Sequence, residues 1–207
     1  MLGGAVAVFV GTLYIGTLAP TVLPYSVPDT LDSPMLQAEV AVLGVGHPTG
    51  YPAYMMLTHL FTYLPFGDPA YGVNLASAVY GVAAVLVVYL AGLRLGRRAV
   101  AAASGALAFG LSGTFWSQAV IAEVYTLEAL LVTLVILFVL LWRDRRDDRY
   151  LLICAFLVGL SLTHHLTSVL LVPGALAFVF LTPSTPRCCR PRSLCSGSVI
   201  RPVTPPT

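Results

Sequence analysis

The chain has 207 residues, of which 57% are hydrophobic and 10% charged, and its mean hydropathy is +0.87. A soluble domain carries about a quarter of its residues as charges, so the composition excludes an ordinary soluble protein. The formal net charge is only +2, which gives no support for a nucleic-acid partner. We therefore expect a membrane protein.

Six apolar segments are expected to form transmembrane helices. A helix needs about 20 residues to cross the hydrocarbon core, and the fifth segment must borrow length from its neighbours. The segments are residues 2–19, 70–92, 99–115, 124–142, 150–163 and 166–181. This pattern predicts an all-α, polytopic membrane domain over residues 1–182. Residues 183–207, rich in proline, serine and arginine, are expected to be a disordered or frame-disrupted cytoplasmic tail.

The basic residues predict the orientation of these helices. All eleven are arginines, and they follow only the second, fourth and sixth segments. Short arginine-rich loops stay in the cytoplasm. We therefore expect a multi-pass protein of the cell membrane, of the bacterial inner-membrane kind, with its N-terminus cytoplasmic. All four histidines and a group of acidic residues then face the extracytoplasmic side.

The first outer loop, residues 20–69, is long enough to be functional. We expect it to hold two amphipathic surface helices. Asp32 or Ser33 can cap the first helix, with Pro34 at its first position. An apolar stripe of Leu36, Val40 and Leu43 then suits the membrane surface. The second helix is expected over residues 53–63.

The same loop contains the first candidate site residues. Asp29 and Asp32 are three residues apart just past the first segment, and a partly desolvated carboxylate there can act as an acid or base. Asp32 can equally be only a helix cap. The hinge GVGHPTGYP, residues 44–52, either presents His47 and Tyr51 to a site or is a plain turn between the helices.

A second group of candidates surrounds the start of the fourth segment, in WSQAVIAEVYTLEAL. Trp116, Ala119, Glu123 and Thr126 are expected to share one helical face, with Trp116 as an interfacial anchor. An acidic residue beside the apolar core is costly, which makes Glu123 a functional candidate. The alternative is that Glu123 only complements a helix dipole. Gln118 and Tyr125, close to it in sequence, are assigned with Trp116 to substrate binding.

The adjacent His164 and His165 lie in the motif SLTHHLT, between the last two segments. On a helix they would point about 100° apart, so they could not readily bind one metal ion together. We expect one of them to face a polar site and the other the lipid headgroups. Both can also be ordinary polar residues at the end of a span.

Together these segments resemble a known family. DSPMLQAEVAVLGVGHPTGYPAYMML, NLASAVYG, WSQAVIAEVYTLEALL and GLSLTHHLTSVLLVPG occur in the order seen in polytopic membrane proteins related to the O-mannosyltransferase that acts on plexin-type immunoglobulin-like domains. The resemblance covers roughly residues 1–180, the N-terminal part of much longer members. It implies a GT-C-like glycosyltransferase fold, in which the catalytic carboxylate of the first outer loop matches Asp32. The chain departs from many members by having Pro34-Met35 in place of Gly-Glu.

The resemblance implies transfer of a sugar, such as a mannose-like hexose, from a polyprenyl-phosphate donor to an extracytoplasmic protein or glycan. The catalytic residues would be Asp32 and Glu123. Asp29, His47, Tyr51, Trp116, Gln118, Tyr125, His164 and His165 would bind the substrates. No metal ion or other cofactor is expected, because the second carboxylate is missing. The alternatives are a proton-coupled transporter or channel module and a non-catalytic remnant.

Overall fold

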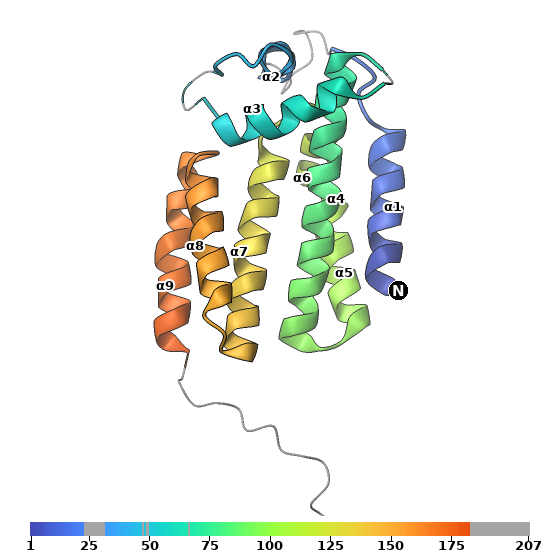
Figure 1. Cartoon of the computed structure of the whole chain (residues 1–207). Coiled ribbons are helices and arrows are strands. Elements are labelled where there is room, and N and C mark those ends of the chain that lie inside the picture. Colours follow the sequence, from blue (N-terminus) through green and yellow to red (C-terminus); the bar gives the residue numbers. More distant parts are fainter. Residues whose placement is uncertain (23–31, 47, 49, 66, 183–207) are drawn as a thin grey trace, which may run out of the picture.

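The computed structural model describes residues 1–22, 32–46, 48, 50–65 and 67–182, and every regular element in that part of the chain is a helix. Long helices stand side by side in a bundle, while α2 (Asp32–Ala41) and α3 (Pro52–His59) lie across one end of it (Figure 1). The predicted all-α class is therefore confirmed. The tail predicted from residue 183 lies outside the described residues.

Each predicted apolar segment corresponds to a helix or to a pair of successive helices. The bundle contains α1 (Leu2–Gly16), α4 (Pro69–Gly96), α5 (Ala99–Gly110), α6 (Gly113–Ala119), α7 (Tyr125–Arg145), α8 (Arg149–Leu162) and α9 (Leu171–Leu181), with short 3₁₀ helices η1 (Leu60–Tyr63) and η2 (Leu166–Leu170). Among the described helices, α4 and α7 are long and apolar enough to cross a membrane, and the bent pair α5–α6 makes a third candidate. The remaining apolar helices are shorter, so six crossings stay a prediction.

Helix α4 is the central element of the bundle, packed against α7, α5 and α1. It starts sharply because Pro69 occupies the first turn and the Asp68 side chain accepts a hydrogen bond from the Tyr71 backbone N–H at 2.7 Å. Its 28 residues span about 42 Å. The helix ends at Gly96, and the backbone of the next residue, Arg97, is left-handed.

The third predicted segment is broken, which the apolar pattern did not reveal. Helices α5 and α6 meet at an angle of 66°. The bend frees the carbonyl of Gly110, and the buried Tyr14 hydroxyl of α1 donates a 2.6 Å hydrogen bond to it. Beyond the bend, the Trp116 indole N–H donates to Thr17 Oγ1 at 3.0 Å. The first contact holds the end of α5, and the second holds α6, against the end of α1.

Helix α2 is fixed to the bundle by a buried chain of amides. The Gln37 amide donates to Asn74 Oδ1 at 2.7 Å, and the Asn74 amide donates to the Ala19 carbonyl at 2.9 Å. Leu36 and Val40 are fully buried beside this chain. The predicted stripe therefore packs into the protein core and not on the membrane surface. Its third member, Leu43, lies past the helix end and is exposed.

A helix is present where the second one was predicted, as α3 followed by η1, and η1 crosses the start of α4 at very close range. A Cβ atom added to Gly72 would stand 2.4 Å from the Phe61 carbonyl oxygen, so only glycine permits this approach. His59 ties α3 to α2, because its Nδ1 lies 2.7 Å from the Val40 carbonyl. This histidine therefore has a structural contact.

The two ends of the bundle differ in their charged residues. Arg97 and Arg98 join α4 to α5, and Arg146 directly follows α7 at its turn into α8. Both connections lie at the end of the bundle opposite α2 and α3 (Figure 1). This segregation agrees with the arginine pattern in the sequence, while the side of the membrane that each end faces stays a prediction.

Candidate functional site

The candidate site lies at the end of the bundle that α2 and α3 cover. Asp32 begins α2 and has an exposed side chain. Glu123 comes from the turn that joins α6 to α7. That turn, residues 120–124, interrupts the helical face that the sequence predicted for Trp116, Ala119, Glu123 and Thr126, so the prediction of one shared face is wrong. The interruption directs Glu123 inward, to 5% exposure.

Glu123 is held by serines of two different helices. The Ser33 hydroxyl of α2 donates to Glu123 Oε1 at 3.4 Å. The Ser77 hydroxyl of α4 accepts from the Glu123 backbone N–H at 3.2 Å and donates to its carbonyl at 3.3 Å. Ser33, predicted as a possible helix cap, therefore serves the site. These bonds fix both the backbone and the carboxyl group of Glu123.

Burial and the charge of Asp32 make the Glu123 carboxyl hard to ionise. Burial is the larger cause and the nearby Asp32 carboxylate the second, and together they raise the pKa of Glu123 to about 7. The hydrogen bond from Ser33 acts in the opposite direction. The site therefore combines an exposed carboxylate with a buried carboxyl that exchanges its proton near neutral pH.

Tyr51 connects this pair to the histidines. It precedes α3 with φ 44° and ψ 50°, a left-handed conformation that is uncommon for a bulky residue and frequent at functional sites. Its side chain is nearly buried, and burial raises the pKa of its hydroxyl, followed by the influence of Tyr125, Asp32 and Glu123. Tyr51 and Tyr125 thus belong to the same cluster as the two carboxyls.

His164 and His165, the two histidines of the SLTHHLT motif, both contact Tyr51. Helix α8 ends at Leu162, so His164 and His165 lie in a turn and are not fixed about 100° apart. The Tyr51 ring centroid is 6.2 Å from that of His164 and 5.9 Å from that of His165. Tyr125 is 6.2 Å from His165. Both histidines therefore border the cluster, and the expectation that one of them faces the lipid headgroups stays a prediction.

Two predicted residues are not brought into this cluster. The contacts of Trp116 are with α1, through Thr17 and the Tyr14 ring at 6.2 Å. The Gln118 amide donates to its neighbour Ser117, and no described contact joins it to Glu123. Asp29 and His47 lie outside the described residues. Their predicted roles, like those of the clustered residues, stay predictions.

Sequence reasoning missed several polar residues that build the site. Ser33 and Ser77 hold Glu123, and the Ser168 hydroxyl donates to Glu128 Oε1 at 2.6 Å. A usable signal was present for one of them. Asn74 and Ser77 are three residues apart in an apolar segment, which places two buried polar groups on one face of α4.

Among the described residues, no group of three or more histidine, cysteine, aspartate or glutamate side chains is close enough to hold a metal ion. The cluster nevertheless contains the groups that acid–base chemistry requires. An exposed carboxylate can accept a proton, and hydroxyl and imidazole groups can orient a polar substrate.

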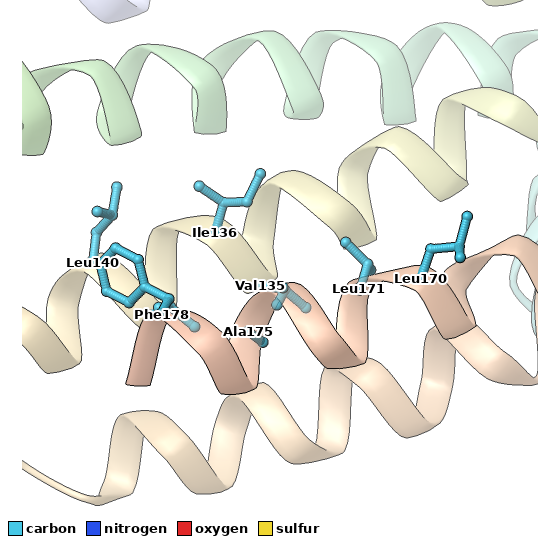
Figure 2. Close-up of a pocket in the computed structure, with 9 residues that line it drawn as sticks. Val135, Ile136, Leu140, Leu170, Leu171, Ala175 and Phe178 are labelled. Atoms are coloured by element: carbon cyan, nitrogen blue, oxygen red, sulfur yellow. The ribbon is translucent and has the colours of Figure 1, made fainter. Parts of the chain in front are cut away.

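An apolar groove lies between α7 and α9, on the flank of the bundle below the site. Figure 2 shows side chains of both helices lining a cavity of about 220 Å³. Leu170, at the end of η2, forms the part of this lining closest in sequence to His165. The other lining residues are Val135, Ile136, Val139, Leu140, Leu171, Gly174, Ala175 and Phe178.

Comparisons with known proteins agree with the resemblance found in the sequence. Residues 32–187 match the family model of the protein O-mannosyl-transferase TMEM260 N-terminal domain. The chain is 34% identical over 176 residues to protein O-mannosyl-transferase TMEM260 of Mus musculus, a match that covers 83% of this chain and 24% of the relative. The chain thus spans about a quarter of the length of that relative, and the family model that it matches is the one for the N-terminal domain. No solved structure gives a significant match.

Proposed function

The chain belongs to the family of the protein O-mannosyl-transferase TMEM260 N-terminal domain, and from that premise we propose that it transfers a mannose-like sugar from a polyprenyl-phosphate donor to an extracytoplasmic protein or glycan. Family membership supports a glycosyltransferase-like function in a membrane protein. The donor, the acceptor and the GT-C-like mechanism are our proposal. We place the reaction at the end of the bundle that α2 and α3 cover.

One observation carries the mechanism: the exposed Asp32 carboxylate stands beside the buried Glu123 carboxyl, whose proton affinity it raises. Asp32 accepts the proton of the acceptor hydroxyl while the hydroxyl oxygen attacks the anomeric carbon of the sugar. The bond from that carbon to the phosphate oxygen breaks, and polyprenyl phosphate leaves with the bonding electrons. Because its pKa is raised to about 7, Glu123 is still protonated in a large fraction of molecules near neutral pH, which reduces the negative charge beside Asp32.

The leaving phosphate needs a hydrogen-bond donor, because it gains negative charge as the bond breaks. The arginines of the described connections lie at the opposite end of the bundle. A histidine of the SLTHHLT motif is therefore the group that we assign to the phosphate. Tyr125 and Tyr51, whose rings lie close to His165, would complete the donor pocket.

The apolar groove supports a lipid-linked donor. Its lining consists entirely of aliphatic side chains, Phe178 and Gly174, and it ends at Leu170, beside the histidine turn. A polyprenyl chain in this groove would hold its phosphate near His165 and its sugar below Asp32. An apolar chain contributes about 25 cal/mol for each Å² that it buries, so the groove adds affinity without recognising the sugar.

We place this end of the bundle outside the membrane, with all six apolar segments crossing it and α2 and α3 in the first outer loop. The acceptor then reaches Asp32 from the extracytoplasmic side, while the donor enters laterally from the membrane lipid. A proton-coupled transporter fits less well, because the described cluster gathers at one end of the bundle and not midway along it.

The direct test is sugar transfer by membranes that contain the chain, supplied with radiolabelled polyprenyl-phosphate mannose and a folded immunoglobulin-like acceptor domain. We expect label on the acceptor, unaffected by EDTA, with the mouse relative as positive control. Substitution Ala175→Trp should reduce transfer at low donor concentration by filling the groove. Leu176→Trp, on the neighbouring position outside the lining, should not. The proposal would be contradicted if the mouse protein transferred the label to the acceptor while this chain left all of it on the lipid.

A further inference from the structure

In the turn after α8, a hydrogen bond to a backbone carbonyl fixes which ring nitrogen of His164 carries the proton. His164 Nε2 lies 2.9 Å from the Val124 carbonyl oxygen. A carbonyl oxygen only accepts hydrogen bonds, so Nε2 carries the proton. Burial lowers the pKa of His164 to about 4, which keeps the ring neutral near pH 7. The other nitrogen, Nδ1, therefore has a free lone pair and can act only as an acceptor.

This acceptor is buried without a partner among the described residues. His164 is 1% exposed, and its Nδ1 makes no described hydrogen bond. A buried unsatisfied polar group costs about 1–3 kcal/mol and calls for an explanation. The His164 ring lies between Tyr51 and Tyr54, at centroid distances of 6.2 and 6.1 Å. A hydroxyl entering beside Tyr51 would satisfy it, whereas a phosphate oxygen has no proton to offer.

In the neighbouring histidine, His165, the nitrogen that remains free is a hydrogen-bond donor and not an acceptor. The backbone N–H of Thr167 donates to His165 Nδ1 at 3.3 Å, and the Thr167 hydroxyl lies 2.6 Å from the same atom. A backbone N–H can only donate, so Nδ1 accepts and the proton of His165 is on Nε2. His165 stacks on Tyr51 and is only partly buried. It therefore presents a donor to the cluster, which suits an anionic oxygen.

We propose that the two histidines divide recognition of the donor, His164 accepting a hydrogen bond from a hydroxyl group of the sugar and His165 donating one to the phosphate. This inference rests on the proposed function and assigns the parts of its substrate. The positions of the two histidines fit this division. His165 precedes η2, whose end lines the apolar groove for the lipid chain. His164 contacts the Val124 carbonyl, next to Glu123. The Tyr51 ring lies against both histidine rings, so it borders both parts of the proposed donor site.

Two substitutions separate these roles from folding. In His164→Gln, the amide nitrogen can still donate to the Val124 carbonyl, but no acceptor remains at the position of Nδ1. In His165→Asn, the amide oxygen can still accept from Thr167, but no donor remains at the position of Nε2. The measurement is the affinity of the purified chain in detergent for polyprenyl-phosphate mannose and for polyprenyl phosphate, with the melting temperature recorded for each variant.

We expect His164→Gln to weaken binding of the sugar-bearing lipid about tenfold, as for the loss of one hydrogen bond, and to leave polyprenyl phosphate unchanged. His165→Asn should weaken both lipids equally. An equal loss of both lipids in His164→Gln, or no loss, would overturn the inference while leaving the proposed function standing. If the unsubstituted chain binds neither lipid, the proposed function fails, and the inference fails with it.

Discussion

Glu123 shows how local surroundings give one side chain its chemistry. The sequence indicated that an acidic residue beside an apolar segment would be costly, and the structure explains how it is accommodated. Ser33 and Ser77 hold it, and burial raises the pKa of its carboxyl to about 7. The pairing of these serines with Glu123 could not be predicted, because they come from α2 and α4 and meet Glu123 only in the folded chain.

The raised pKa of Glu123 predicts a pH-dependent contribution to stability. An unfolded chain releases this proton near pH 4.5, whereas the folded protein holds it to about pH 7. The folded state therefore loses stability as pH rises through this window. The melting temperature of Glu123→Gln relative to the unsubstituted protein should increase from pH 4.5 to 7, by an amount on the order of a few °C.

His164 provides a control of opposite sign. Its pKa is lowered, from 6.5 to about 4, so the folded state gains stability as pH rises from 4 to 6.5. The melting temperature of His164→Gln relative to the unsubstituted protein should therefore fall over that range. Parallel curves for both variants would show that neither buried group is linked to folding in this way.

At the scale of elements, the positions of the helices could be predicted and their interruptions could not. Long apolar runs mark α4 and α7 because hydropathy follows from composition. The bend between α5 and α6 lies in residues 110–114, GLSGT, whose turn residues a reading of hydropathy alone passes over, and the turn after α6 is mostly apolar. The site depends on these interruptions: the turn before α7 supplies Glu123, and the early end of α8 supplies both histidines.

The crossing of η1 over α4 gives a prediction about one glycine. Gly72→Ala would place a methyl group 2.4 Å from the Phe61 carbonyl, and displacing a backbone atom costs about 1–3 kcal/mol. We expect a lower melting temperature. Gly105→Ala in α5 is the matched control, because nothing lies within 4 Å of its added carbon and the helix gains about 1 kcal/mol. Equal melting temperatures for the two variants would mean that η1 does not press on α4.

At the scale of the whole molecule, charge segregation is the feature that the sequence predicted best. The arginine-bearing connections and the candidate site lie at opposite ends of the bundle (Figure 1). Which end faces outward depends on a membrane, and the arginine rule is the argument for it. The roles of Asp29 and His47 also depend on segments outside the described residues, so that part of the predicted site stays open to experiment.

Cysteine labelling measures the orientation directly. In a variant without native cysteines, a membrane-impermeant reagent added outside intact cells should label a cysteine at Asp68 and miss one at Arg145. Asp68 caps the start of α4 at the site end, and Arg145 ends α7 at the other. The reverse pattern would place the site in the cytoplasm and remove access to an extracytoplasmic acceptor. Permeabilised cells, in which both positions should react, are the control.

The central claim is that the carboxylates at the covered end of the bundle carry out sugar transfer, with Asp32 as the base. Asparagine keeps the shape of Asp32 and begins a helix about as well, so Asp32→Asn should fold normally. It cannot take the proton, and loss of a general base typically lowers the rate by about 10²–10⁴-fold. Asp29→Asn, three residues earlier, is the matched control and should have a smaller effect.

The decisive measurement is the rate of mannose transfer from polyprenyl-phosphate mannose by the unsubstituted protein, Asp32→Asn and Asp29→Asn in membranes, at equal protein levels and with melting temperatures recorded. The account predicts a loss of at least about 100-fold for Asp32→Asn with little change in melting temperature. A folded Asp32→Asn protein that keeps most of its transfer activity would contradict the account and leave Asp32 as a structural residue at the start of α2.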